Sequence, residues 1–318
     1  MVKCFRRFFS IMFVVMIPCA HHAVFAEPSP SEADDITNPT YHSTVSEVRL
    51  VFFATDEHNH NVQELKKDDF AVIDNERVIR DFRGFTRSDT TNLNVVVLID
   101  SSESVLPRLQ TEITDAVQLI SRSSSGPSDG LSVLSFSGLG THVVCSEDCR
   151  DLPTPRILSL PRGGATPLFD ALETAATLLA KRSRPDVWPV VILFSDGDDT
   201  ISKISRREVL DKILSIGAQI YAVDVSGSGS PSNGSAVLQN LANDSGGRYL
   251  RISDGPSSIL DHVMDDLHSA RVVTYVYPGP DSDFHSIRIL PSRNLNLKFH
   301  SRCGYYHDSR HIASQENP

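Results

Sequence analysis

The 318-residue sequence lacks the clusters of cysteine and histidine that build zinc and iron–sulfur sites. It holds five cysteines, and only Cys145, Cys149 and Cys303 lie beyond residue 26. A zinc site needs about four such ligands, and no second cluster supplies them. In an oxidising compartment Cys145 and Cys149 could form a small disulfide loop, which leaves Cys303 odd, and we favour this pairing over free thiols.

Positive charge is also scarce. The sequence has 30 Lys and Arg against 40 Asp and Glu, for a formal net charge of −10. Removal of residues 1–26 would take away three basic residues and no acidic one, so the remaining chain would be more acidic still. No basic stripe with interleaved aromatic residues is present, and an acidic surface repels a phosphate backbone. Nucleic acid is therefore not an expected partner.

Long apolar runs are absent except near the N-terminus. Three basic residues precede an apolar run over residues 8–17, and the small-residue site Val24-Phe25-Ala26 follows. This pattern predicts a secretory signal peptide over residues 1–26, and a secreted or periplasmic location. The run is short for a membrane span, so a membrane enters only if this segment is retained as an anchor.

The two flanks of the chain have strand texture without intervening helices. Residues 27–45 are polar and aperiodic, which predicts a flexible leader, and residues 308–318 form a tail. The expected strands, in segments 46–88 and 271–307, cover residues 48–53, 70–74, 78–85, 272–277, 284–290 and 295–300. Asp74-Asn75-Glu76 suits a tight turn between the second and third of these. About three strands on each flank are too few for a stable sheet. We therefore expect the flanks to pair in one small β-sandwich, into which the middle of the chain is inserted.

The middle of the chain, residues 89–270, alternates apolar strands with helical periodicity. The expected strands are 93–99, 130–135, 141–144, 187–194, 219–223 and 248–251, and helical faces lie at 105–120, 168–179, 205–214, 236–242 and 256–269. Ser205 and Glu208 form a capping box for the third of these helices. Strands that are apolar on both faces and separated by helices predict an α/β domain with a doubly wound, mostly parallel sheet.

Oxygen-bearing side chains follow two of these strands and one glycine-rich loop. Asp100 ends the run VVVLI and is followed by Ser102 and Ser104, Thr166 follows GGA, and Asp196 follows VVILFS. Ligands of open α/β sheets lie outside the carboxyl ends of the strands, where these residues are expected to meet. Oxygen donors suit magnesium, manganese or calcium and not a soft metal.

Each fragment also has a simpler interpretation. A serine or threonine before a helix, such as Ser104 or Thr166, is commonly an N-cap, and Asp-Gly after a strand is commonly a turn. The coincidence of three such fragments at one predicted edge favours a shared cation, because buried carboxylates and hydroxyls are costly without partners.

The three stretches D-x-S-x-S, G-x-T-P-L and S-D-G resemble, in this order, the metal-ion-dependent adhesion site of von Willebrand factor A-type domains, over roughly residues 91–269. The resemblance implies a Rossmann-like domain that binds a magnesium ion, with manganese or calcium as alternatives. It also implies the ligand set, in which Asp100 and Asp196 act directly or through waters and the hydroxyls of Ser102, Ser104 and Thr166 bind the ion. A position left open would accept a Glu or Asp of a protein partner. The implied function is cation-dependent protein binding in adhesion or assembly, without catalysis.

The flanks are similar to those of bacterial secreted "von Willebrand factor A-related" proteins, a group rich in acidobacteria. The stretch VRLVFFATDEHNHNVQELKKDDF and the closing GYY carry this resemblance. Two departures concern the sandwich and not the metal loops: Arg302-Cys303 precedes the glycine of GYY, and the turn at residues 56–61 lacks a glycine. In the wider family, ligation is coupled to helix movement, which we would expect here in the helix at 256–269.

Three enzyme or cofactor interpretations are weaker. Gly227-x-Gly229 lacks the third glycine of a dinucleotide-binding loop, and no G-x-S-x-G elbow surrounds Ser102 as a hydrolase nucleophile. An aspartyl-phosphate enzyme would need a second acid near Asp100 and a lysine after a later strand, and neither is found.

Two further interpretations involve no enzyme. His58-Asn59-His60 could bind a metal, but a polar cluster between strands is usually a solvated turn. A structural module with a vestigial metal site also stays open.

Overall fold

The computed structural model describes residues 47–88, 92–108, 113–123, 130–146, 149, 152–184, 187–226, 232–279 and 283–306. The predicted signal peptide, leader and C-terminal tail lie outside these ranges, as does Gly227-x-Gly229. Within the ranges, no helix has both the length and the apolar content needed to cross a membrane.

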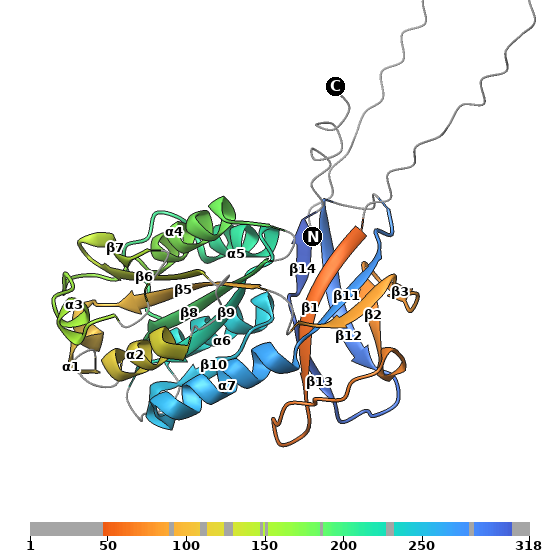
Figure 1. Ribbon diagram of the computed structural model, residues 1–318. Helices are drawn as coiled ribbons and strands as arrows, with labels where there is room; N and C mark the ends of the chain where they lie inside the picture. The colour runs from red at the N-terminus through yellow and green to blue at the C-terminus, as the bar shows by residue number, and fades with distance from the viewer. Residues whose placement is uncertain are drawn as a thin grey trace, which may run out of the picture. The chain divides into compact units, whose positions relative to one another are not determined.

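A six-stranded sheet forms the centre of the α/β domain, with strand order β10-β9-β8-β5-β6-β7 (Figure 1). Five strands are parallel, and β7 pairs antiparallel with β6. The strands are β5 (Asn92–Asp100), β6 (Gly130–Ser137), β7 (Gly140–Cys145), β8 (Val187–Ser195), β9 (Gln219–Asp224) and β10 (Tyr249–Arg251). This sheet confirms the prediction of a mostly parallel, doubly wound α/β fold.

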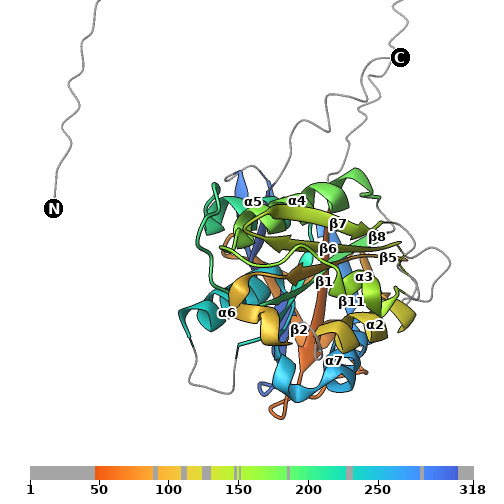
Figure 2. The ribbon, with the colours of Figure 1, turned by 90° about the vertical axis from the view of Figure 1, so that its left-hand side faces the viewer.

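Helices cover both faces of this sheet (Figures 1 and 2). Helices α4, α5 and α6 share one apolar core with the sheet, and α2, α3 and α7 share the other. Successive residues of β5 alternate between the cores: Val96 and Leu98 face the first, and Val97 and Ile99 the second. The helical segments are η3 (Glu103–Val105), α1 (Leu106–Arg108), α2 (Thr114–Ser123), α3 (Thr154–Leu158), α4 (Leu168–Lys181), α5 (Arg206–Ser215), α6 (Asn233–Ser245), η5 (Ile252–Asp254) and α7 (Pro256–Ser269).

Local signals set several helix ends. The Ser205 hydroxyl accepts a hydrogen bond from the Glu208 N–H, and the Glu208 carboxylate accepts one from the Ser205 N–H. This confirms the predicted capping box at the start of α5. Helix α6 ends at Gly246, whose φ of 85° is the left-handed conformation that glycine adopts without strain.

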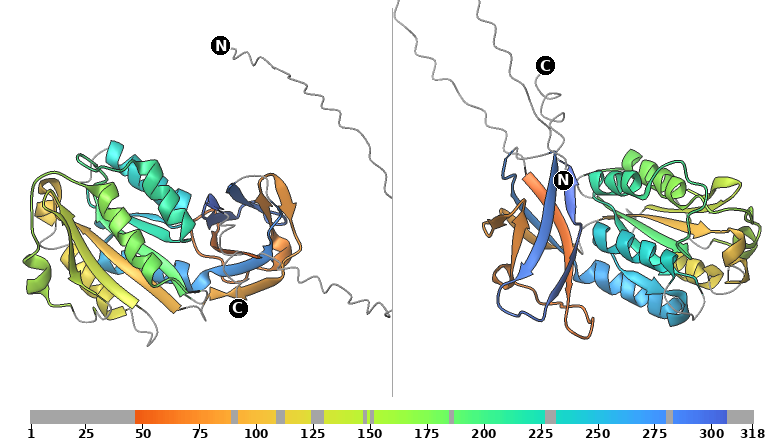
Figure 3. Two further views of the ribbon diagram at one scale, coloured as in Figure 1. Left: turned by 90° about the horizontal axis from the view of Figure 1, so that it is seen from above. Right: turned by 180° about the vertical axis from the view of Figure 1, so that it is seen from behind.

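Two four-stranded sheets flank the α/β domain in sequence, and each combines strands from both flanks. Their strand orders are β13-β1-β11-β4 and β14-β12-β2-β3. In Figure 3, orange strands from the N-terminal flank lie among blue strands from the C-terminal flank. The strands are β1 (Glu47–Thr55), β2 (Phe70–Asp74), β3 (Arg77–Ile79), β4 (Gly84–Arg87), β11 (Arg271–Val276), β12 (Phe284–Pro291), β13 (Lys298–Ser301) and β14 (Gly304–Tyr306), with a short helix η1 (Lys67–Asp69) before β2.

Side chains from both sheets share one apolar core, as a sandwich requires. Phe52 and Tyr275 come from the first sheet, and Val72 and Ile287 from the second. The α/β domain is inserted between β4 and β11, as predicted.

One expected strand is wrong in its extent. The segment 78–85 does not continue as one strand, because β3 ends at Ile79 and β4 begins at Gly84 in the other sheet. Between them Phe82 is 7% exposed and packs in the shared core. The chain therefore crosses from one sheet to the other at this point.

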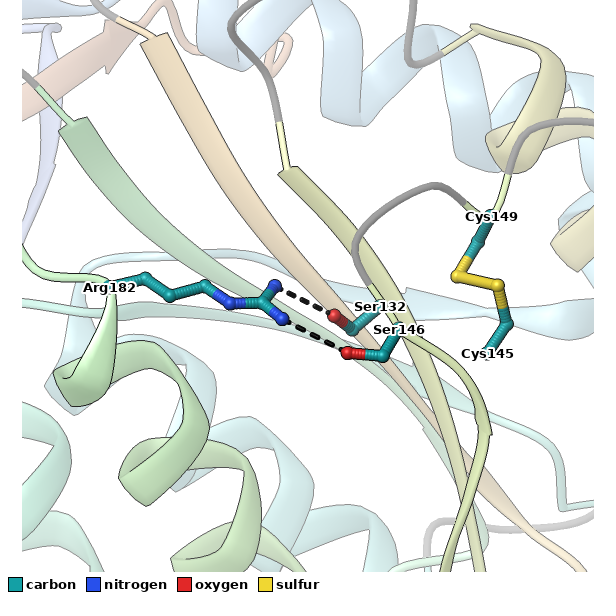
Figure 4. The surroundings of a disulfide bond; sticks show 5 residues. All are labelled: Ser132, Cys145, Ser146, Cys149 and Arg182. Atoms are coloured by element: carbon teal, nitrogen blue, oxygen red, sulfur yellow. Dashed lines mark hydrogen bonds between the residues drawn. A yellow bond between two sulfur atoms is a disulfide. The ribbon is translucent and has the colours of Figure 1, made fainter.

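Cys145 and Cys149 form a disulfide, with their Cα atoms 5.6 Å apart (Figure 4). This confirms the favoured interpretation of the cysteines, and Cys303 is a free, partly buried thiol. In the same region Arg182, at the end of α4, donates hydrogen bonds of 3.0 Å to the Ser132 and Ser146 hydroxyls (Figure 4).

Candidate metal site

The first of the predicted site residues, Asp100, is the last residue of β5 and has no solvent exposure. One carboxylate oxygen accepts a hydrogen bond of 2.9 Å from the Ser102 N–H, and the other accepts one of 2.7 Å from the Ser195 hydroxyl. Ser195 ends β8, the neighbouring parallel strand, so Asp196 leaves the sheet at the same edge. The structure thus brings the turns after Asp100 and Ser195 together.

The glycine-rich loop before Thr166 lies against the turn after Asp100. The Gly163 N–H donates to the Ser101 carbonyl at 2.9 Å, and the Glu103 N–H donates to the Gly164 carbonyl at 3.4 Å. Both glycines have positive φ, 90° and 75°, so a side chain at either position would strain the loop.

Thr166 is also joined to the loop that follows Asp196. Its N–H donates to the Thr200 hydroxyl at 2.7 Å, and its carbonyl accepts from the Thr200 N–H at 2.9 Å. Thr166 is 4% exposed. Both hydrogen bonds are made by backbone atoms of Thr166. Its side-chain hydroxyl takes no part in them and is available as a metal ligand.

The hydroxyls of Ser102 and Ser104 lie 3.3 Å apart. Ser102 is the residue before the short helix η3, but its side chain makes no capping hydrogen bond, and Ser104 lies inside η3. The N-cap of α4 is Pro167 rather than Thr166. The capping interpretation of Ser104 and Thr166 is therefore wrong.

The electrostatics of this edge favour a cation. Burial raises the pKa of the Asp100 carboxyl to about 6, and hydrogen bonds from Ser102 and Ser195 oppose this rise. The negative charge of Asp196 raises the pKa of Asp100 further. Burial, followed by the charge of Asp196, also raises the pKa of Asp198, which is exposed. The acidic groups at this edge repel one another, and a bound cation would offset that repulsion.

The turn after Asp196 packs closely against the start of α6, and a glycine stands on each side of this contact. Gly197 has a φ of 82°, and a Cβ built on it would overlap the Gly234 carbonyl in the first turn of α6. A Cβ on Gly234 would in turn overlap the Asp196 carbonyl. The absence of both side chains lets the Asp196 turn pack directly on α6.

The loop after Asp196 is held against the first turn of α4. The Asp199 carboxylate accepts hydrogen bonds from the Phe169 N–H and the Ser202 hydroxyl, and the Asp170 carboxylate accepts one of 2.9 Å from the Lys203 N–H. Asp199 therefore anchors this loop through one of its carboxylate oxygens.

The supporting roles of two residues were not expected from the sequence. Ser195 orients the Asp100 carboxylate, and Thr200 holds the backbone of Thr166. A serine that ends the apolar run VVILFS is a weak signal for the first. No local pattern marks Thr200.

The donor set fits a hard cation in chemistry. Across the described ranges, no group of three or more His, Cys, Asp or Glu could hold a metal ion. The predicted set contains only two carboxylates, and its other donors are hydroxyls. Oxygen donors of this kind suit magnesium, manganese or calcium.

The stretch His58-Asn59-His60 is a solvated turn, as favoured from the sequence. His58 and His60 are exposed, and the N–H groups of both donate to the Asp56 carboxylate at 2.8 Å. Asn59 has a φ of 62°, a conformation that asparagine tolerates in turns.

Comparison with known proteins identifies a family and a fold. Residues 94–265 match the von Willebrand factor type A domain family. No curated protein matches the chain. Among solved structures, proximal thread matrix protein 1 from the mussel byssus is similar at 17% identity with a TM-score of 0.46, over 56% of this chain and 49% of that one. This chain thus spans about half the length of the byssus protein.

Two further solved structures are similar. An aerotolerance-related membrane protein from Bacteroides fragilis matches at 15% identity and a TM-score of 0.42, over 54% of this chain and 99% of that one. The manganese-loaded TRAP protein of Plasmodium vivax matches at 15% identity and a TM-score of 0.42, over 73% of this chain and 97% of that one. These identities and TM-scores are too low to bear on function.

Proposed function

Since this chain belongs to the von Willebrand factor type A domain family, we propose that it is an exported protein-binding module that holds its partner through a divalent cation. The ion is magnesium, with manganese or calcium as alternatives. The proposed ligands are Asp100, Ser102, Ser104, Thr166 and Asp196. A Glu or Asp of the partner protein completes the coordination in adhesion or assembly.

The burial of Asp100 is the observation that carries this proposal. A fully buried carboxylate is costly unless a cation or several hydrogen bonds compensate it. The hydrogen bonds to Asp100 come from the Ser102 N–H and from the hydroxyls of Ser102 and Ser195, and the charged group that affects its pKa is another carboxylate, Asp196. A divalent ion at this edge would supply the missing positive charge.

Each proposed ligand has a distinct task. Asp100 provides negative charge at a fixed place, because Ser195 and the Ser102 N–H hold both of its oxygens. Ser102, Ser104 and Thr166 provide neutral oxygens, so the ligand set carries no more negative charge than the divalent ion neutralises, and a further carboxylate can still approach the ion. Bound magnesium keeps waters that an incoming carboxylate can replace.

Export is supported by the pattern of residues 1–26 and by the disulfide. Cysteine pairs of this kind persist in oxidising compartments such as the periplasm or the cell exterior. We propose that the protein is secreted or periplasmic, reaches a membrane only if the signal segment is retained, and belongs with the bacterial secreted proteins whose flanks it resembles.

Isothermal titration with magnesium chloride tests the metal site. We expect saturable binding of about one ion per chain, and no binding in the double variant Asp100→Ala with Thr166→Ala. Asp198→Asn is the matched control, because Asp198 lies near Asp196 but outside the proposed ligand set, and it should still bind. Identical traces for the wild type and the double variant would support a vestigial site and remove the metal proposal.

Affinity capture from a periplasmic or secreted extract tests the partner. Proteins retained with magnesium should elute when a chelator is added, and the double variant should not retain them. Retention that is unaffected by chelation would assign binding to the flanking sandwich instead.

The proposal also expects no catalysis. Generic phosphate and ester substrates should not turn over above background. Turnover that is present in the wild type and lost in Asp100→Ala would replace the binding function by a magnesium-dependent phosphoryl-transfer or hydrolase activity.

A further inference from the structure

A pocket of about 320 Å³ lies at the end of the sheet opposite to Asp100. It includes Trp188 near the start of β8 and Gln219 at the start of β9. The flanking sandwich contributes Arg49 from β1 and Arg302 from the segment between β13 and β14. The pocket is therefore built jointly by the α/β domain and the sandwich, and none of the proposed metal ligands lines it.

The lining of this pocket is strongly basic. It contains three arginines, Arg49, Arg184 and Arg302, and no Asp or Glu. The whole chain has ten more acidic than basic residues, so the charge of this lining is opposite in sign to the net charge of the chain. Arginine residues in a lining without Asp or Glu form a favourable environment for an anion.

Arg302 is the central basic group. Its guanidinium donates a hydrogen bond of 3.0 Å to the Arg49 carbonyl and lies 5.3 Å from the centre of the Tyr305 ring. A terminal nitrogen of Arg302 lies close to Gly217, which also lines the pocket. A Cβ atom built on Gly217 would be 3.2 Å from this nitrogen. The Nε atom of Arg302 is buried without a hydrogen-bond partner, and within the described ranges no carboxylate forms an ion pair with this side chain.

The charge of Arg302 is only partly compensated by the protein. Burial lowers the pKa of its guanidinium, Tyr275, Tyr305 and Asp74 oppose this effect, and the nearby Arg49 adds to it. A buried cation whose direct partner is a neutral carbonyl is less stable than one that faces an anion.

Two further side chains of the pocket have unsatisfied polar atoms. Trp188 and Gln219 are 1% and 3% exposed, and neither the indole N–H nor the Gln219 side-chain oxygen has a hydrogen-bond partner. Unpartnered buried groups are rare in folded proteins and call for an explanation such as a ligand or ordered water. The indole N–H of Trp188 can donate to an oxyanion, whereas the Gln219 oxygen is an acceptor and needs a hydroxyl group or an ordered water.

We propose that this pocket binds a small organic oxyanion, a phosphate or carboxylate compound, which bridges the α/β domain and the flanking sandwich. Arginine suits such a ligand because its planar fork donates two parallel hydrogen bonds to a carboxylate or phosphate. A volume of about 320 Å³ accommodates a small metabolite rather than a macromolecule. This site does not depend on the proposed metal site.

The fluorescence of Trp188, the single tryptophan of the chain, reports directly on this pocket. The full chain, freed of metal by passage over a chelating resin, is titrated separately with sodium phosphate and sodium succinate at constant ionic strength and without divalent cations, so that the metal site takes no part. We expect a saturable change in emission with at least one anion. Saturation by one and not the other identifies the headgroup.

Two variants make the test specific. Arg302→Met and Arg184→Met should each weaken binding on the order of tenfold, since each removes a charge-assisted hydrogen bond donor. Arg184 is exposed, so its variant keeps the test valid if Arg302→Met fails to fold. The control is Arg293→Met, an exposed arginine that pairs with Asp68 outside the pocket, and it should titrate as the wild type does.

No saturable change with either anion would overturn the proposal. So would equal midpoints for the wild type, Arg184→Met and Arg302→Met, because the signal would then come from elsewhere. Since no divalent cation is present, failure here leaves the proposed metal function untouched, and loss of magnesium binding leaves this site untouched.

Discussion

Asp100 combines full burial with a carboxyl group that must be ionised to bind a cation. In the absence of metal, burial raises its pKa to about 6, so the folded protein holds this proton more tightly than the unfolded chain does. This group contributes stability that is fully present below about pH 4 and is lost as the pH rises through about 6. A cation that binds the ionised form would restore stability at neutral pH.

The pH dependence of unfolding tests this reasoning. In chelating buffer, the wild type should lose about 2–3 kcal/mol between pH 4 and pH 7 relative to Asp100→Asn, in which the group cannot titrate. Urea unfolding of both proteins at the two pH values gives the comparison, and magnesium at pH 7 should stabilise only the wild type. If the two proteins differ in their free energy of unfolding by the same amount at pH 4 and at pH 7, burial does not raise the pKa of Asp100.

The motif residues were predictable from the sequence, whereas their supports were not. The spacing D-x-S-x-S places Asp100, Ser102 and Ser104 on one turn, and that signal is local. The bond from Ser195 to Asp100 joins residues 95 positions apart, and only the pairing of β5 with β8 brings them together. Contacts of this kind require the register of the sheet.

At the scale of elements, two local signals gave accurate predictions, although the capping interpretation of Ser104 and Thr166 was wrong. The capping box of α5 and the apolar face of α4 each lie within one turn or a few turns of helix, and both elements form as expected. The expected strand at 78–85 failed because its residues divide between two sheets, and a run of strand-like residues does not encode which sheet each part joins.

The disulfide at the end of β7 offers a test at this scale. Cys145 and Cys149 close a very short loop, for which chain entropy predicts a stabilisation of about 2 kcal/mol. The double variant Cys145→Ser with Cys149→Ser should lower the free energy of unfolding by about that amount, measured by urea unfolding.

Cys303→Ser is the control for that experiment, because Cys303 is a free thiol. It should leave the effect of a reducing agent unchanged. If reduction has no effect on the unfolding midpoint of the wild type, the pair contributes nothing to the stability of this edge.

Helix α7, the last helix of the α/β domain, is tied to the sandwich near its C-terminal end. The fully buried carboxylate of Asp266 accepts hydrogen bonds of 2.8 Å from both Arg248 and Asn61. Asn61 belongs to the loop after β1. Any movement of α7 that accompanies ligation would have to break or carry these bonds, so the sandwich would resist it.

At the scale of the whole molecule, the two flanks are interdependent. The sequence predicted about three strands on each flank, and this low count led to the prediction that the flanks pair. The structure has four strands on each flank, and each sheet takes strands from both. The distribution over two sheets could not be predicted, because it depends on side chains that meet only after folding. Tyr275 of β11 and Tyr305 of β14 belong to different sheets, yet both hydroxyls donate to Asp74 at 2.8 Å.

Asp74 is therefore expected to hold the sandwich together. It is fully buried and also lies 2.7 Å from the His285 ring nitrogen Nδ1. Asp74→Ala should cost on the order of 3 kcal/mol, because it leaves three buried polar groups without their partner. Asp68→Ala removes an exposed ion pair with Arg293 and should cost less than about 1 kcal/mol.

Urea unfolding of these two variants against the wild type gives the measurement. A loss in Asp74→Ala no larger than that in Asp68→Ala would mean that apolar packing alone holds the two sheets together.

The central claim is that five oxygen-bearing side chains from three loops share one hard cation. Crystals soaked in manganese chloride and measured for anomalous scattering test it most directly. The account predicts one strong peak bound by Asp100, Ser102, Ser104, Thr166 and Asp196, at roughly 2–2.5 Å or through a single water. A peak elsewhere, or a refined structure in which these side chains are too far apart to share an ion, would contradict it.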